Sequence, residues 1–278
     1  MDYCETPVTG PLAASVRCWW SLSSPAAPAG VAEPALPDGS PELILNLGDP
    51  FEHRGPDGRL RRQPAAFLVG QITRPMTVRP TGRVDIIALR LEAHGAAVLL
   101  PDVSRLTDAW APLQALGLPG VTPLLRALRR SRDAGVRAAI LARWYAERAA
   151  SAGAVADATV VAAVQALRAS HGGASLDALC ARLGTSPRTL QRRFRTQVGI
   201  SPKLLARILR FQRVFHVWQR EPRRLARVAV QVGYFDQSHM IRDFRQFAGQ
   251  PPAGFQATVG RFTEVLLGGG WAVRRLGD

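Results

Sequence analysis

Hydrophobic and polar positions recur with different spacing in the two halves of the chain. In the first 92 residues, short apolar runs alternate with turn residues, and Pro and Gly are frequent. Four of these runs predict β-strands, over residues 42–47, 66–70, 76–80 and 84–91. The last run is almost wholly apolar and rich in β-branched residues, so we expect that strand to be buried on both faces.

Beyond this β-rich segment the apolar positions recur at helical spacing. Short helices are predicted over residues 96–100 and 109–116, and a helical pair over 123–132 and 136–148. Residues 149–156 are small and weakly patterned. We therefore place a connection between two domains there.

After Asp157 the chain has a helical pattern almost to its end, and His171-Gly172-Gly173 ends the first of these helices. The whole pattern predicts an α+β protein: a β-rich, small barrel-like N-terminal domain with helices, followed by an all-α domain. The expected parts are a sensor or dimerisation domain (1–150, β-rich 1–92 and helical 93–150), a linker (151–157), the all-α domain (158–258) and a tail (259–278).

Charge separates the same two halves. Up to Ala150 there are 17 basic and 14 acidic residues, a net of +3, whereas the remainder has 19 basic and 7 acidic residues, a net of +12. A basic domain beside a nearly neutral one indicates a module that binds a polyanion. A general preference for arginine is the alternative, and Lys203 is indeed the only lysine. That preference does not explain why acidic residues also become rarer in the second half.

Composition narrows the class of protein. The 278 residues are 47% hydrophobic and 21% charged, which suits a globular chain of two domains. No apolar run approaches the roughly 18 residues of a membrane span, and the acidic start is unlike a signal peptide. Cys4, Cys18 and Cys180 lack disulfide or metal spacing, which fits a reducing cytoplasm. We expect a cytoplasmic protein with no membrane partner, metal or cofactor.

A first helix-turn-helix unit is predicted between Ser175 and Phe194. Ser175 suits the N-cap of a short helix, Gly184 can turn the chain in the left-handed conformation, and Ser186 can cap the next helix. On that second helix Leu190 and Phe194 are four residues apart and face inward. Donor side chains that can reach base edges in a major groove face outward, namely Arg188, Gln191, Arg192 and Arg195.

The pattern repeats further along the chain. An apolar stripe through Val228 and Val232 is followed by a turn at Gly233 and a predicted N-cap at Asp236. The outward residues of the next helix are Gln237, Ser238, Ile241, Arg242 and Arg245. Of these, Ile241 has two interpretations: contact with a thymine methyl group, or simple packing at the helix edge.

A long helix that starts at Ser201-Pro202 is predicted to hold the two units at a fixed separation. Its buried face comprises Leu204, Ile208, Phe211, Phe215 and Trp218. A second, basic face comprises Lys203, Arg207 and Arg210. We weigh two locations for the basic face, near DNA phosphates or in solvent.

The tandem arrangement resembles the AraC/XylS family of bacterial transcription regulators over roughly residues 158–258. The matching stretches are SLDALCARLGTSPRTLQRRF (175–194), GISP (199–202), VGYFDQSHMIRDFRQF (232–247), GQPP (249–252) and Phe255. Two ordered motifs are far more specific than one. The chain departs from the family at Tyr234-Phe235, where Phe followed by a small polar residue is more usual.

The resemblance implies base-reading roles for Arg188, Gln191 and Arg192 in the first unit. In the second unit it implies such roles for Gln237, Ser238, Ile241 and Arg242, and a backbone contact for His239. Double-stranded DNA is the expected partner, and RNA polymerase, a small-molecule effector and a second copy of the chain are candidate partners. The N-terminal domain is then expected to sense a small molecule or to mediate self-association.

Little in the N-terminal half points to catalysis, and we expect no enzyme activity. Cys18-Trp19-Trp20 is best interpreted as a buried anchor, while Trp19, Trp20 and Phe67 are a hypothesis for the lining of an apolar pocket. Two alternatives to a regulator stay open. One is a DNA-repair enzyme that accepts alkyl groups on cysteine, and the other is an architectural protein that binds DNA without sequence preference.

Overall fold

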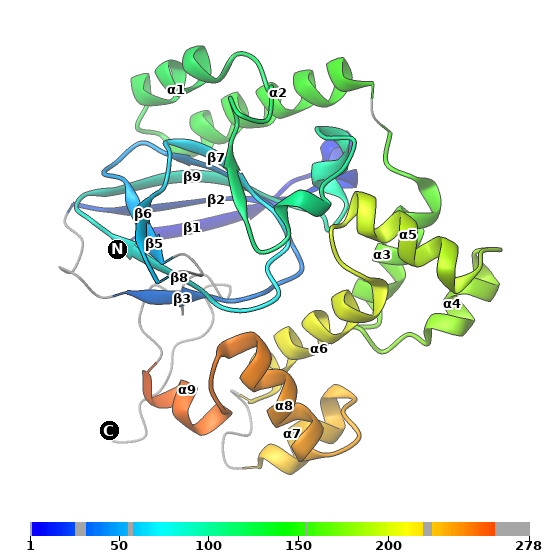
Figure 1. Cartoon of the computed structure of the whole chain (residues 1–278). Helices are drawn as coiled ribbons and strands as arrows, with labels where there is room; N and C mark the ends of the chain where they lie inside the picture. The colour runs from blue at the N-terminus through cyan, green and yellow to red at the C-terminus, as the bar shows by residue number, and fades with distance from the viewer. Residues whose placement is uncertain (1, 26–31, 55–57, 154, 219–223, 259–278) are drawn as a thin grey trace.

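The computed structural model describes residues 2–25, 32–54, 58–153, 155–218 and 224–258. Its N-terminal half is built from antiparallel strands, its C-terminal half from helices (Figure 1). The strands are β1 (Asp2–Pro7), β2 (Val16–Ser24), β3 (Glu33–Ala35), β4 (Glu42–Asn46), β5 (Phe51–Arg54), β6 (Leu60–Arg62), β7 (Ala66–Val69), β8 (Met76–Pro80), β9 (Val84–Leu91) and β10 (Trp110–Pro112).

Within the described residues these strands form two sheets. One has the order β1-β2-β9-β4-β7-β10 and the other β3-β8-β5-β6. The predicted strand β9 lies inside the larger sheet, between β2 and β4. Its residues alternate: Ile87 and Leu89 face a helical layer, whereas Ile86 and Ala88 face the second sheet. The expectation that this strand is buried on both faces is therefore confirmed.

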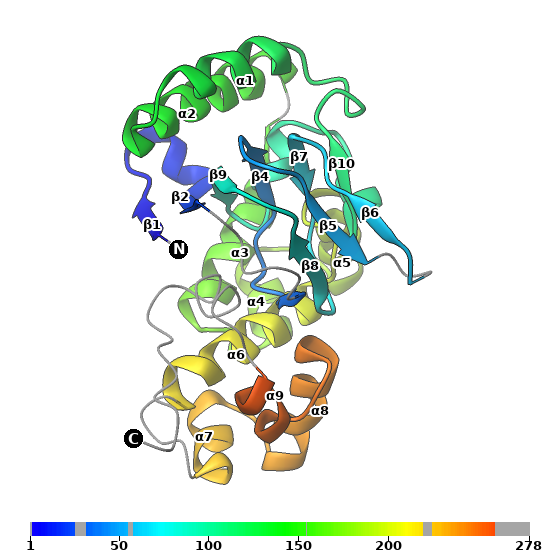
Figure 2. The same ribbon diagram turned by 90° about the vertical axis from the view of Figure 1, so that its left-hand side faces the viewer.

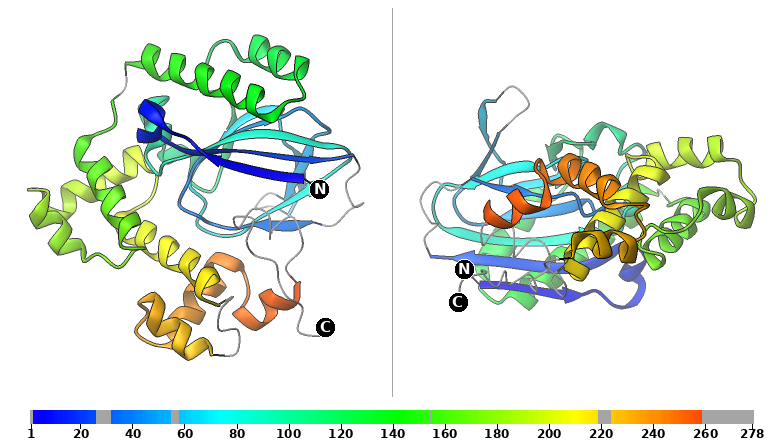
Figure 3. Two further views of the ribbon diagram at one scale, coloured as in Figure 1. Left: turned by 180° about the vertical axis from the view of Figure 1, so that it is seen from behind. Right: turned by 90° about the horizontal axis from the view of Figure 1, so that it is seen from below.

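Helices α1 (Val121–Arg130) and α2 (Ala134–Ala152) cover the outer face of the larger sheet. The side chain of Asp133 caps α2, and the buried Tyr145 hydroxyl donates to the carbonyl of Gly95 at 2.8 Å. Figure 3 shows these green helices at one side of the sheets and the yellow helix α6 (Pro202–Trp218) at the other. None of the helices in the described residues has the length and apolar character needed to cross a membrane.

Two predicted helices of the N-terminal half differ from the structure. The helix expected over 109–116 is wrong, because this segment forms strand β10 and then a turn. Trp110 pairs with Val69 and Pro112 with Phe67, so the sheet edge overrides the local helical pattern. The helix expected over 96–100 is a short 3₁₀ helix, Gly95–Val98, one of three with Gly10–Ala14 and Ser104–Leu106 in the described residues.

The C-terminal half is helical, as predicted. Its further helices are α3 (Ala158–Ala169), α4 (Leu176–Arg182), α5 (Pro187–Gln197), α7 (Leu225–Val232), α8 (Gln237–Ala248) and α9 (Pro252–Thr258). Helix α6 runs through their centre (Figure 2). The ring of Phe211 lies 5.0–5.3 Å from those of Phe215, Phe244 and Phe247, which locks α6 to α8.

The two halves share side chains and hydrogen bonds. Leu36 is buried in the hydrophobic core of the helical half. Gly39 has φ +77, and a Cβ there would lie 2.9 Å from Leu205 of α6, so this turn approaches the helix too closely for a larger residue. The Gln212 amide donates to the carbonyl of Pro37 at 2.5 Å. The segment of residues 36–40 therefore packs directly on α6.

The end of α5 is attached to the N-terminal half as well. The Val103 amide donates to the Thr196 carbonyl at 2.9 Å, and the Thr107 hydroxyl donates to the Gly199 carbonyl at 2.7 Å. These contacts tie the first helix-turn-helix unit to the loop that precedes β10.

Candidate DNA-binding surface and an interior cavity

Helices α4 and α5 form the first predicted unit, and their boundaries follow from local capping. The Ser175 hydroxyl accepts a hydrogen bond from the amide of Ala178 at 3.5 Å, and that of Ser186 accepts one from Thr189 at 3.2 Å. Gly184 has φ +58, the left-handed turn that the sequence required. These three predictions are confirmed.

Helix α5 divides its side chains as the sequence analysis expected. Leu190 and Phe194 are fully buried in the core of the helical half. The four predicted contact residues are all exposed, namely Arg188, Gln191, Arg192 and Arg195. Arg193 lies between the two faces and bonds to Asp157 at 2.9 Å, so it connects α5 to the start of α3. The outer face of α5 therefore presents donors to solvent.

Helices α7 and α8 form the second unit. Gly233 has φ +91, and the Asp236 carboxylate accepts a hydrogen bond from the amide of His239 at 2.6 Å. Met240 and Phe244 are buried on the inner face of α8. On its outer side Gln237, Ser238, Arg242 and Arg245 are exposed, and His239 and Ile241 are half-buried. The His239 ring packs edge-on against Tyr234, at 5.1 Å between centroids.

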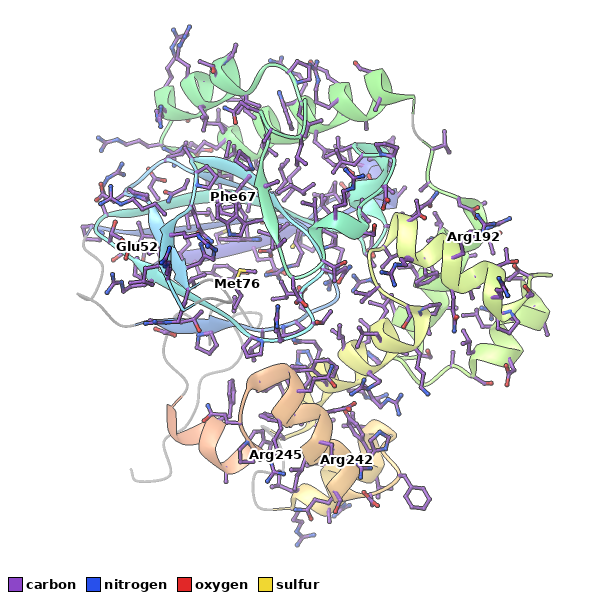
Figure 4. The ribbon with its side chains drawn as sticks, in the orientation of Figure 1. Glu52, Phe67, Met76, Arg192, Arg242 and Arg245 are labelled. Carbon is purple, nitrogen blue, oxygen red and sulfur yellow. The ribbon has the colours of Figure 1, made fainter. Side chains whose placement is uncertain are left out.

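The two recognition helices, α5 and α8, lie on one side of the molecule. Both face the viewer in Figure 1 and lie on the same side in the perpendicular view of Figure 2. Figure 4 shows Arg192 of α5 and Arg242 and Arg245 of α8 on this face. A single duplex can therefore approach both helices from one direction.

On the basic face of α6 only Lys203 has the solvent location weighed from the sequence, whereas Arg207 and Arg210 bond within the protein. Arg207 bonds to the buried carboxylate of Asp243 at 2.6 Å and to Gln246, also at 2.6 Å. Arg210 donates to the carbonyl of Gly233 at 3.0 Å. Lys203 is exposed. The two arginines therefore attach α6 to α8 and to the turn of the second unit.

In the sequence, Phe235 stands out only as a departure from the family pattern. In the structure its side chain is 91% exposed, directly before the N-cap of α8, whereas its neighbour Tyr234 is buried. An exposed aromatic ring beside a recognition helix is a candidate contact residue. The signal in the sequence was the departure itself, a large apolar residue where a small polar one is usual.

A partly open cavity of about 100 Å³ lies between the two sheets. Trp20 and Phe67 line it, as the sequence hypothesis held. Trp19 does not line it, because adjacent residues of a strand point to opposite faces and Trp19 packs against the helical layer. Figure 4 shows Phe67 and Met76 in the interior of the N-terminal half. Gln212 of α6 completes the lining from the helical half.

The polar part of the lining is centred on a buried arginine. The Arg90 Nε lies 3.0 Å from Glu42 and 3.4 Å from Asp38, and its Nη1 lies 2.9 Å from Glu5. The Trp20 indole donates to Glu42 at 3.1 Å. Burial raises the pKa of Glu42 above its usual range. The pKa of Arg90 rises too, because Glu42 and Asp38 outweigh the opposing effect of burial.

The surroundings of Cys18 and Cys180 do not favour a reactive thiolate. Burial raises the pKa of the Cys18 thiol to about 12, and burial also raises the pKa of Cys180. A thiol with a raised pKa holds little thiolate at neutral pH and is a poor nucleophile. In the part of the chain that the structure describes, no group of three His, Cys, Asp or Glu side chains is placed to hold a metal ion.

A second, more open hollow of about 510 Å³ is lined by strands β5, β6 and β8 of the smaller sheet and by β10 of the larger one. It is lined by His53, Arg54, Arg61, Arg74, Pro75, Met76, Asp108, Ala109 and Trp110. Its charged lining is mostly basic, which distinguishes it from the interior cavity.

Comparison with known proteins gives two family matches. The family described as a helix-turn-helix domain matches residues 179–258, and a domain of unknown function, DUF6597, matches residues 6–111. The first match covers both recognition helices. The second covers most of the two sheets. A sequence search found no significant match among curated proteins.

Solved structures with a similar course of the chain include ToxT from Vibrio cholerae. It is 7% identical, with a TM-score of 0.49 over 85% of this chain and 97% of that one. A structure of ToxT with a bound unsaturated fatty acid is 10% identical, with a TM-score of 0.47 over 84% and 94%. The AraC-like transcriptional activator CuxR is 14% identical, with a TM-score of 0.32 over 64% and 69%.

The helix-turn-helix match covers the second motif and all but the first four residues of the first motif on which the sequence resemblance depends. The motifs are present as two capped units whose recognition helices share one exposed side. The chain is a DNA-binding transcription regulator, and its C-terminal residues 179–258 form a helix-turn-helix domain of the AraC type.

Proposed function

We propose that the chain reads two successive major-groove segments of one DNA duplex, the first with α5 and the second with α8. The observation that carries this proposal is the common orientation of the two helices, each with exposed Arg and Gln side chains. Successive major grooves on one side of B-DNA are about 34 Å apart, so reading both requires a fixed separation. Helix α6 supports it, because its partners Asp243 and Gly233 belong to the second unit.

The proposed contacts differ in kind. Arg188, Gln191 and Arg192 in the first unit suit guanine and adenine edges, as do Gln237, Ser238 and Arg242 in the second. Arg195 is a further exposed donor on the outer face of α5, and His239 is proposed to contact the backbone. The half-buried Ile241 suits a thymine methyl group at the groove edge.

We further propose that a small molecule in the interior cavity modulates DNA binding. The cavity wall includes Leu36, Asp38 and Ser40, and the same segment of residues 36–40 packs on α6. An occupant that moves this segment therefore acts on the helix between the two DNA-binding units. Two further parts of the proposal rest on the sequence alone. One is the set of candidate partners, a second copy of the chain and RNA polymerase, and the other is the set of domain bounds 1–150, 151–157 and 158–258.

Selection of bound duplexes from a random pool tests the DNA-reading proposal. We expect a consensus with two conserved blocks one helical turn apart. Arg192→Ala should relax base preference at one position by about 1–3 kcal/mol. Arg129→Ala is the matched control, because Arg129 is an exposed arginine on the distant helix α1. An equal loss on all sequences would make Arg192 a phosphate contact, and a pool without any consensus would contradict the proposal.

A further inference from the structure

The interior cavity has the chemical character of a site for a cation. Three aromatic side chains from three strands line it: Trp20 of β2, Phe51 of β5 and Phe67 of β7. The face of an aromatic ring is electron-rich and attracts ammonium groups, and enclosure by several rings is the common way to bind them. Met76 and Ile44 add apolar surface between the rings.

The charges of the lining point the same way. Asp38, Glu42 and Arg90 are the charged residues of the lining, so carboxylates exceed cations by one. Arg90 is directed at Glu42 and Asp38 through Nε and at Glu5 through Nη1. An anionic ligand would have to displace these carboxylates from Arg90 and would meet Glu42 and Asp38 at close range. A ligand with a positive nitrogen finds acceptors already in place.

The arginines near Asp38 and Glu42 do not cancel the net negative charge of the cavity lining. Arg17, which is exposed, donates to the Ser40 hydroxyl at 2.9 Å, and Arg168 donates to the same oxygen at 3.1 Å. Arg168 is in turn paired with Glu92 at 2.7 Å. Neither arginine belongs to the cavity lining, although Arg168 also interacts electrostatically with Asp38, whereas the carboxylates of Asp38 and Glu42 are part of the lining.

Size limits the ligand further. A closed apolar cavity of about 150 Å³ can hold benzene. The interior cavity, of about 100 Å³, is partly open, so it suits a ligand with a single small ring that lies partly in the cavity mouth. No cluster of potential metal ligands occurs among the described residues, which favours an organic cation over a metal ion.

We propose that the interior cavity binds a small organic ammonium ion. Its apolar body lies among Trp20, Phe51 and Phe67, and its nitrogen faces Asp38 and Glu42. The inference rests on the proposed role of the cavity as an effector site. Because Asp38 belongs to the segment of residues 36–40, the charged end of the ligand meets the part of the wall that packs on α6.

Three probes with one ring and different heads test the charge preference on the full chain: benzylammonium, benzyl alcohol and benzoate. Isothermal titration calorimetry without DNA gives each affinity. We expect benzylammonium to bind about tenfold or more tightly than benzyl alcohol, and benzoate not to bind in the cavity. Benzoate binding that equals or exceeds benzylammonium binding, and that survives Arg74→Ala in the open basic hollow, overturns the proposal.

Variants locate the site. Asp38→Asn should weaken benzylammonium binding about tenfold or more and reduce its advantage over benzyl alcohol. Glu42→Gln should do the same, and Glu147→Gln, on the exposed surface of α2, should leave the affinity unchanged. If neither cavity variant alters binding, the proposal is wrong. If one variant does not fold, the other variant and the probe preference of the unmodified chain still decide the matter.

The result is independent of DNA reading. Selective ammonium binding together with a random selection pool that yields no consensus would leave the cation site and remove the proposed DNA reading. A clear DNA consensus together with equal binding of all three probes would do the reverse.

Discussion

The recognition face and the interior cavity use arginine in opposite ways. Arg192 on α5 is exposed, as are its neighbours Arg188 and Arg195. Arg90 on β9 is buried and surrounded by Glu5, Asp38 and Glu42. The exposed guanidinium groups can donate hydrogen bonds to a polyanion in solution. The buried guanidinium group of Arg90 instead donates to the neighbouring carboxylates, and the cavity keeps a net negative charge. The neighbours of an arginine, more than its identity, therefore decide which charge its site attracts.

The largest expected difference between the two regions is in how strongly salt weakens their binding affinities. If the recognition face meets about 6–10 phosphates, DNA affinity should fall by about 10³–10⁵ between about 50 and 200 mM salt. Benzylammonium binding in the buried cavity should change far less, because buried charges are weakly screened. Fluorescence anisotropy with labelled DNA and calorimetry with the amine measure the two slopes. If the two affinities depended equally on salt, the two regions would not differ in how well water and ions screen their charges.

Removal of the buried arginine should have the next largest effect. Arg90→Met leaves three carboxylates without their cation and should lower the free energy of unfolding by about 3–5 kcal/mol. The same change at the exposed Arg192 should alter it by no more than about 0.5 kcal/mol. Urea denaturation followed by circular dichroism measures both. A small effect at Arg90 would mean that the acidic group does not depend on it.

Arg207 represents an intermediate case, because it pairs with one buried acid at the edge of the core. Arg207→Ala leaves the Asp243 carboxylate, 2% exposed, without its cation and should cost about 2–3 kcal/mol of stability. It should also weaken binding to all DNA sequences alike, since it loosens the second unit. If the variant instead changes base preference at one position while stability is retained, Arg207 contacts DNA directly.

The smallest effect is expected at Phe235. Phe235→Ser should change the free energy of unfolding by no more than about 0.5 kcal/mol, because the ring is almost fully exposed. It should lower DNA affinity by less than Arg192→Ala does, by up to about 1 kcal/mol if the ring covers a sugar or a thymine methyl group. Competition binding against the selected site measures this. An unchanged affinity would show that the ring does not contact DNA.

Local signals explain what the sequence could predict. The caps at Ser175, Ser186 and Asp236 and the turns at Gly184 and Gly233 depend on neighbouring residues only, so the tandem units were predicted closely. The division of exposed and buried residues on the recognition helices follows from the same periodicity. The proposed base contacts are not tested by the structure and stay predictions.

Long-range pairing explains what the sequence could not predict. The ion pairs of Arg90 bring together Glu5, Glu42 and Arg90 from β1, β4 and β9, and no spacing along the chain relates these residues. The segment Cys18-Trp19-Trp20 was interpreted as an anchor or as part of a pocket lining but not as strand β2, since its pairing partners are distant in sequence. The roles of Arg207 and Arg210 likewise depend on acceptors more than 20 residues away.

The burial of Leu36 within the helical core has a consequence for how such proteins can be recombined. The core of the DNA-binding half includes the Leu36 side chain, which comes from a loop of the N-terminal half. A fragment that begins near residue 158 would expose an apolar notch on α6, and heating the intact chain should unfold both halves in one calorimetric transition. A chimera with a different N-terminal half must therefore supply an apolar side chain that fills the place of Leu36 on α6.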